Sequence, residues 1–113
     1  MSAAGGGHPS DAERAEAALP VLESLVRAAA AGDAAAVEGC HDEAVTWLDA
    51  GGAVTGRAEA AARLLDRAGP GASWAAPRQH GAHAVLAWTS PDGAPGGVGV
   101  EVRRGRVVLV TAP

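Results

Sequence analysis

A lone carboxylate, Asp49, ends an otherwise apolar strand-like stretch, residues 44–49, and is the first candidate for chemistry. With regular alternation, Val45, Trp47 and Asp49 share one face, so burying Trp47 would carry Asp49 inward. A desolvated carboxyl has a raised pKa, which is the condition for acid–base work near neutral pH. The alternative is a turn cap ahead of the glycine pair 51–52, and the sequence favours neither.

Two histidines, His80 and His83, lie in the densest polar cluster of the chain, residues 78–83. Imidazole titrates near neutral pH, so either histidine could carry a proton. His80 is also typical of a solvated loop, and His83 of a strand histidine bonded at a sheet face. In a regular strand His83 shares a face with Val85, and Trp88 lies on the other. The sequence leaves open which face looks into a pocket.

Few large side chains are available to line or fill an interior, because the chain has three tryptophans and no Phe or Tyr. We expect an apolar pocket whose polar end is the catalytic residue Asp49, with His83 as its partner. The expected walls are a helix leucine and all three tryptophans: Leu25, Trp47, Trp74 and Trp88. The alternative for Trp47 and Trp74 is that they only fill the core.

No metal and no cofactor are predicted. The neighbours Cys40 and His41 and the pair His80 and His83 lie on short irregular segments without a second cysteine, so no zinc pattern is matched. The glycine-rich residues 93–99 lack both the Gly-Lys-Ser/Thr ending and the following helix of a phosphate-binding loop.

The chain is acidic overall, with a formal net charge of -4 at pH 7, and its nine basic residues are spread along the sequence. Because there is no basic stripe, we expect no nucleic-acid partner. One cysteine excludes an internal disulfide and fits a reducing compartment. No signal-peptide pattern and no run of about 18 apolar residues is present, so we expect a soluble, cytoplasmic protein without a membrane partner.

The elements that must position these residues are helices first and strands later. Residues 1–9 are rich in Gly, Ala and Pro and are predicted to be disordered. Ser10 and Glu13 form a capping box that starts a long helix with one apolar stripe. Asp33 caps a short second helix, and residues 57–68 form a third.

Strands of period two alternate with turn residues in the rest of the chain. They are predicted at residues 44–49, 53–55, 73–78, 82–89, 97–103 and 106–111. We therefore predict a single α+β domain over residues 10–113, in which the helices pack on one face of a curved sheet.

Four stretches carry a resemblance to a known family: AGDAAAV at 31–37, AVTW at 44–47, TGRAEA at 55–60 and VEVRRGRV at 100–107. In this order and spacing the sequence resembles the nuclear transport factor 2-like superfamily, and within it the SnoaL-like and ketosteroid-isomerase-like proteins. The resemblance implies a cone-shaped fold, in which three helices of the N-terminal half pack on a curved antiparallel or mixed sheet around an apolar pocket.

The resemblance also bears on the site. Asp49 matches the acid–base aspartate of the ketosteroid isomerases if the strand holds one extra residue, whereas strict counting puts Leu48 there. Leu25 stands at the position of that family's first-helix tyrosine, and Val98 at that of its second carboxyl. We therefore do not expect a true ketosteroid isomerase.

Two classes of function follow, and the sequence leaves open whether the protein is an enzyme. The first is a small SnoaL-like pocket protein that binds a hydrophobic small molecule and acts as a cofactor-independent acid–base isomerase or cyclase of a polyketide-like metabolite. Asp49 and His83 would move the proton. The second is a non-catalytic ligand-binding or dimerisation module. The sequence does not identify the ligand.

The final predicted strand, residues 106–111, is apolar on both faces, because Val108 and Val110 oppose Val107 and Leu109. A strand buried on both sides, in a sheet covered by helices on only one, needs a second cover. We therefore expect a homodimer that pairs through the outer face of the sheet.

Overall fold

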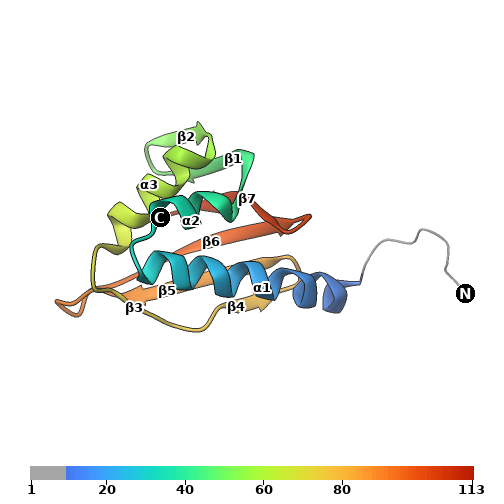
Figure 1. Ribbon diagram of the computed structural model, residues 1–113, viewed down its shortest axis with the longest axis horizontal. Coiled ribbons are helices and arrows are strands. Elements are labelled where there is room, and N and C mark those ends of the chain that lie inside the picture. The colour runs from blue at the N-terminus through green and yellow to red at the C-terminus, as the bar shows by residue number, and fades with distance from the viewer. Residues whose placement is uncertain (1–9) are drawn as a thin grey trace, which may run out of the picture.

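The computed structural model describes residues 10–113 (Figure 1), so the predicted disorder of residues 1–9 lies outside the described residues. The described chain forms three helices, α1 (Asp11–Ala30), α2 (Ala34–Gly39) and α3 (Arg57–Ala68). It also forms seven strands: β1 (His41–Asp49), β2 (Gly52–Thr55), β3 (Ser73–Trp74), β4 (Arg78–His80), β5 (His83–Thr89), β6 (Pro95–Arg103) and β7 (Arg106–Thr111).

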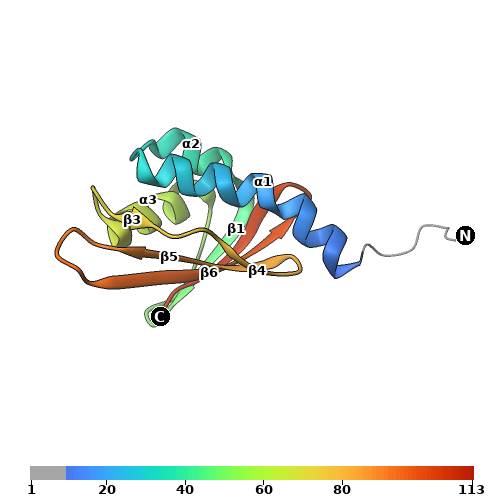
Figure 2. The same cartoon turned by 90° about the horizontal axis from the view of Figure 1, so that it is seen from below.

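All strands join one curved sheet in the order β2-β1-β7-β6-β5-β3, and β4 also pairs with β5. The pairing of β1 with β7 is parallel and every other pairing is antiparallel. Figure 2 shows that α1, α2 and α3 lie on the same side of the sheet. The predicted α+β architecture, with three helices on one face of a curved mixed sheet, is confirmed.

Local capping fixes where the first two helices begin. Ser10 Oγ accepts a hydrogen bond from the Glu13 backbone N–H at 3.1 Å, and Glu13 Oε1 accepts one from the Ser10 N–H at 3.2 Å. These bonds satisfy donors that the first turn of α1 would leave without partners. Asp33 caps α2 in the same way, through the Ala36 N–H at 3.1 Å. The capping box predicted from the sequence is confirmed.

The core lies between the helices and the inner face of the sheet. The largest side chains that are fully buried there come from α1, α3, β1 and β5: Leu22, Leu25, Leu64, Trp47 and Leu86. Trp88 is buried beside them, and the half-buried Trp74 packs against it with ring centroids 4.9 Å apart and ring planes tilted by 47°. All three tryptophans, the largest side chains of the protein, therefore lie on the helix-covered side of the sheet.

The predicted starts of β2, β5 and β6 are wrong by one or two residues, and two larger differences have a clear physical reason. The strand predicted at 73–78 is two short strands, β3 and β4, because the segment between them contains Pro77, which has no N–H to donate to a ladder. β1 begins at His41, earlier than predicted, since His41 pairs with Val107 of β7 and the Val107 N–H donates to the Cys40 carbonyl at 2.9 Å. Polar residues at 42–43 hide this extension from a period-two pattern.

His41 is a polar side chain in an otherwise apolar core, with none of its surface exposed. Its Nδ1 lies 2.7 Å from the Val37 carbonyl oxygen, and because a carbonyl only accepts, Nδ1 carries the proton. Among the described residues, its Nε2 has no hydrogen-bond partner. Burial lowers the pKa of His41, against the opposing effects of the Val37 carbonyl and the Glu38 charge. The folded protein therefore keeps this imidazole neutral.

A neutral His41 predicts a loss of stability in mild acid. Below a pH of about 6.5 the unfolded chain takes up a proton at this position that the folded chain resists. The stabilising contribution is complete above that pH and is lost as the pH falls through the lower folded-state pKa. Urea unfolding at a series of pH values should show a decline of up to about 1.4 kcal/mol per pH unit.

The exposed His80 supplies the matched control for this prediction, because His80→Gln should keep the decline whereas His41→Leu should flatten it. An unchanged decline in His41→Leu would assign the pH dependence to other groups.

Close packing explains why β6 carries glycine opposite Trp88. Gly96 pairs with Trp88 across the β5–β6 ladder. A Cβ at Gly96 would lie 2.8 Å from Cζ2 of the Trp88 ring and closer still to its Nε1. The indole therefore lies directly over the glycine backbone, and β6 has no room for a side chain there.

Gly96→Ala should destabilise the fold by about 1–3 kcal/mol, because the indole must leave its position over β6. Gly39→Ala is the matched control, since a Cβ at Gly39 meets nothing within 4 Å. That control should leave stability unchanged or raise it by up to about 1 kcal/mol. Thermal melting of both variants measures the difference, and equal melting temperatures would contradict the packing argument.

Candidate functional site

Asp49 lies at the end of β1, with 12% of its side chain exposed, and both of its oxygens accept hydrogen bonds. Oδ2 accepts from Nε1 of the buried Trp47 at 2.8 Å, and Oδ1 accepts from the Gly51 N–H at 2.8 Å. The carboxylate therefore combines the two interpretations that the sequence left open. It shares the inward side of β1 with Trp47, and it also caps the turn that leads into β2.

Two arginines of α3 complete the surroundings of Asp49. Arg63 Nη1 lies 3.3 Å from Oδ2 and Arg67 Nη2 lies 3.7 Å from the same oxygen. Arg63 also donates from Nε to Glu59 at 3.0 Å, and the Arg67 guanidinium lies 5.6 Å from the centre of the Trp47 ring. Positions 59, 63 and 67 follow one another at helical spacing, so one face of α3 presents this charged row to the end of β1.

The predicted rise in the pKa of Asp49 is wrong. The hydrogen bonds from Trp47 and the Gly51 N–H lower the pKa of this carboxyl most, burial raises it by less, and the charges of Arg63 and Arg67 lower it a little further. The sequence argument considered only the desolvation that accompanies Trp47. It missed that the indole N–H of Trp47 itself points at the carboxylate, and that α3 brings two cations to it. The i, i+4 arginine pair of α3 was the available signal.

Asp49 opens on a surface hollow of about 530 Å³ between β1 and α3. Five residues of α3 line it together with Asp49: Glu59, Ala62, Arg63, Asp66 and Arg67. Three carboxylates and two guanidinium groups line the hollow, so it is a polar surface site of oppositely charged groups. It differs in this respect from the apolar pocket expected around Asp49.

His83 lies on the opposite face of the sheet from Asp49. The alternation of β5 buries Ala84, Leu86 and Trp88 under the helices and turns His83 outward, where 68% of its side chain is exposed. Its Nε2 lies 3.1 Å from Oε1 of Glu101 on β6. The structure therefore does not bring together the two residues that the sequence analysis paired.

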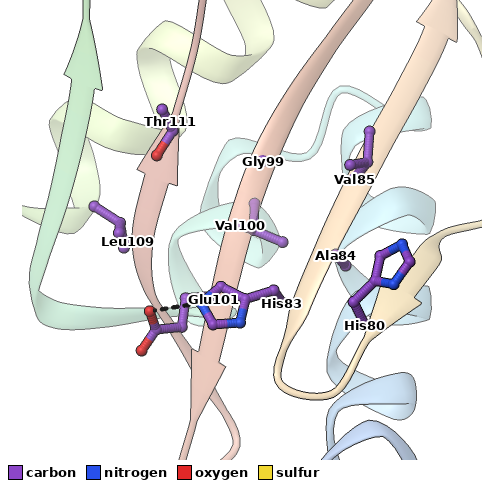
Figure 3. Close-up of a pocket in the computed structure, with 9 residues that line it drawn as sticks. All are labelled: His80, His83, Ala84, Val85, Gly99, Val100, Glu101, Leu109 and Thr111. Atoms are coloured by element: carbon purple, nitrogen blue, oxygen red, sulfur yellow. Dashed lines mark hydrogen bonds and ion pairs between the residues drawn. The ribbon is translucent and has the colours of Figure 1, made fainter.

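The outward side of β5, β6 and β7 carries a second hollow, of about 220 Å³ (Figure 3). Its lining is mainly apolar, with two histidines and one carboxylate: His80, His83, Ala84, Val85, Gly99, Val100, Glu101, Leu109 and Thr111. The side chain of Glu101 is only 14% exposed, and its second oxygen contacts Arg103 Nε. Of the predicted catalytic residues, this hollow contains His83.

The four residues expected to wall a pocket lie together on the inner side of the sheet. Leu25, Trp47 and Trp88 are buried in the core, and Trp74 is half-buried against it. The two hollows described above are lined by other residues. That these four side chains receive a ligand stays a prediction.

Within residues 10–113, no three His, Cys, Asp or Glu side chains are grouped so that they could hold a metal ion. In the same range, no helix has both the length and the apolar character needed to cross a membrane.

The lowered pKa of Asp49 gives a direct test of its surroundings. In an NMR pH titration its carboxyl should titrate below the ordinary range of aspartate. Trp47→Phe should raise that pKa most, because it removes the donor with the largest effect, and Arg63→Gln should raise it less. Because the folded pKa is lowered, the associated stability is present above a pH of about 4 and is lost as the pH falls through the folded value. An Asp49 that titrates above the ordinary range would contradict this account.

Comparisons with known proteins show which solved structures share this fold. No model of a protein family matches the sequence, and no curated protein matches it. Among solved structures, the chain is similar to an NTF-2-like protein of unknown function from Burkholderia xenovorans, with a TM-score of 0.70 and 25% identity over 87% of this chain and 82% of that one.

Two further structures extend the similarity. A candidate ketosteroid isomerase from Kribbella flavida gives a TM-score of 0.66 at 19% identity, over 85% of this chain and 76% of that one. A candidate polyketide cyclase from Sinorhizobium meliloti gives a TM-score of 0.64 at 13% identity, over 83% of this chain and 94% of that one. At these identities the likeness establishes the fold and not the chemistry. The resemblance seen in the sequence is confirmed, and the chain has the fold of the nuclear transport factor 2-like superfamily.

Proposed function

We propose that this protein is a non-catalytic module that binds a hydrophobic small molecule and works as a homodimer. The observation that carries the proposal is the state of Asp49, the best candidate for proton transfer. Trp47 and Gly51 each donate to its carboxylate, and two arginines lie within 3.7 Å of it. Such a group is a stable anion that ties β1 to α3.

A general base must keep an oxygen free to reach the substrate proton, and its pKa must lie near the working pH. Asp49 fails the second condition, since its pKa is lowered, and donors already take up part of the acceptor capacity of both oxygens. The imidazole of His83 lies on the other face of the sheet and cannot serve as its partner. These two facts favour binding over catalysis.

The binding part of the proposal rests on the tryptophans. Of the four predicted wall residues, Trp74 is the one that is partly exposed, and its ring packs against that of Trp88, tilted by 47°, at the β3 edge of the sheet. We place the entry for an apolar ligand at this pair, because moving the Trp74 ring away from Trp88 would expose an apolar face of the buried Trp88 ring. The free thiol of Cys40 is consistent with a cytoplasmic location.

A second candidate function is a cofactor-independent isomerase or cyclase acting on a polyketide-like metabolite. The hollow beside Asp49 favours it, because Arg63 and Arg67 stand where they could stabilise an oxyanion while the carboxylate moves a proton. The names of the structural neighbours from Kribbella flavida and Sinorhizobium meliloti point to the same chemistry.

One experiment separates the two candidates. Binding of 1-anilinonaphthalene-8-sulfonate, an aromatic dye with one sulfonate, is followed by the fluorescence of the dye, and isomerisation of a β,γ-unsaturated steroid ketone is followed by absorbance. We expect saturable dye binding that Trp74→Ala weakens by about tenfold or more, and no isomerisation above the buffer rate. Asp49→Asn should change the dye affinity by less than about threefold.

Asp66→Asn is the control for Asp49→Asn, because Asp66 lines the same hollow on α3 without bonding to the Trp47 indole. Turnover by the unmodified protein that disappears in Asp49→Asn and persists in Asp66→Asn would establish the enzyme instead. Dye binding that does not saturate would count against the binding module.

A further inference from the structure

A carboxylate and an imidazole form a pair on the face of the sheet that is turned away from the helices (Figure 3). Glu101 of β6 and His83 of β5 are partners in the strand register, and Glu101 Oε1 lies 3.1 Å from His83 Nε2. Because an ionised carboxylate only accepts hydrogen bonds, Nε2 carries the proton of the neutral imidazole. The second nitrogen of His83, Nδ1, is therefore an acceptor, and within residues 10–113 it has no hydrogen-bond partner.

Glu101 is held in place by two neighbours and so orients the imidazole. Its side chain is only 14% exposed, although it lies on the open face of the sheet, and its second oxygen contacts Arg103 Nε. A carboxylate that accepts from one side of an imidazole fixes the tautomer and makes the other nitrogen a stronger acceptor. His80, the register partner of His83 on β4, lines the same hollow but contacts no carboxylate of the described chain. His83 is therefore the imidazole that is prepared to receive a hydrogen-bond donor.

The hollow of about 220 Å³ continues from this pair over β6, between apolar side chains. Gly99 forms its floor, where a Cβ would meet only the Thr111 carbonyl oxygen, at 3.9 Å. Val85 of β5, 46% exposed, and the half-buried Leu109 of β7 border the glycine on either side. The volume lies below the roughly 300–1,000 Å³ of pockets for drug-sized ligands, so the hollow suits an occupant with a single ring.

From these observations we infer that the hollow binds a small phenol, an apolar ring with one hydroxyl group. The hydroxyl donates to His83 Nδ1. The ring lies over Gly99, between Val85 and Leu109, where glycine allows a flat group to approach the backbone closely. This site goes beyond the proposed function, because it lies on the opposite face of the sheet from the tryptophan pair.

Two probes that differ in one group test the hydrogen bond. The phenol is p-cresol, and in p-xylene a methyl group replaces the hydroxyl. Each probe is titrated into isotope-labelled protein, and the NMR shift of the Gly99 amide follows its binding. We expect saturable shifts with both probes, with affinities in the millimolar range because the molecules have so few atoms.

Three variants separate the contributions to binding. His83→Leu should weaken p-cresol binding by about fivefold, because one hydrogen bond is lost, and should change p-xylene binding by less than about twofold. His80→Leu is the matched control, since it removes the imidazole that has no carboxylate partner, and it should change either affinity by less than about twofold. Gly99→Leu fills the hollow and should abolish the binding of both probes, and circular dichroism verifies its fold.

Equal losses for the two probes in His83→Leu would overturn the hydrogen bond and the ligand class. Binding that survives Gly99→Leu would overturn the site. An unshifted Gly99 amide, in a protein that light scattering shows to be a dimer, would mean that a second copy covers the hollow, and would also overturn the site. Trp74→Ala should leave p-cresol binding unchanged, so failure of this site and failure of the proposed interior ligand are distinguishable.

Discussion

The burial of Trp47 is the contact on which the rest of this structure depends. Its ring fills the space between β1 and α3, with none of its surface exposed, and its one polar atom, Nε1, must find an acceptor. Asp49, two residues along the same face, supplies that acceptor. The carboxylate then holds Arg63 and Arg67, and so anchors α3 over the end of the strand. One large side chain in a chain of small ones thus links core packing to surface charge.

This linkage also limits what the end of β1 can do. In an apolar pocket, desolvation raises the pKa of a carboxyl group toward neutral pH. Here donated hydrogen bonds and two cations lower the pKa of Asp49 and keep it ionised. The fold supports both arrangements, since it specifies where a strand ends and not which groups meet there. Similarity of fold to candidate isomerases and cyclases is therefore a weaker guide than the partners of Asp49 themselves.

The two faces of the sheet differ in what their side chains contact. The inner face carries the large residues under the helices, and there Gly96 makes room for the Trp88 ring within the same chain. The outer face carries Gly99, which makes room for nothing inside the chain, beside the exposed Val85. Glycines three residues apart on one strand thus serve internal packing in one case and an open surface in the other.

The sequence by itself determined the helix caps, the helix over 57–68, the turn glycines and the alternation of the late strands, because these depend on neighbours a few residues apart. From that alternation the sequence also indicated that His83 and Val85 share one face of their strand and that Trp88 lies on the other. Only the tertiary structure decided which face looks inward, because the helices cover one side of the sheet and sequence periodicity is the same for both. The protonation of Asp49 was likewise decided by residues 14 and 18 positions away on α3, and by the direction of an indole N–H, neither of which periodicity encodes.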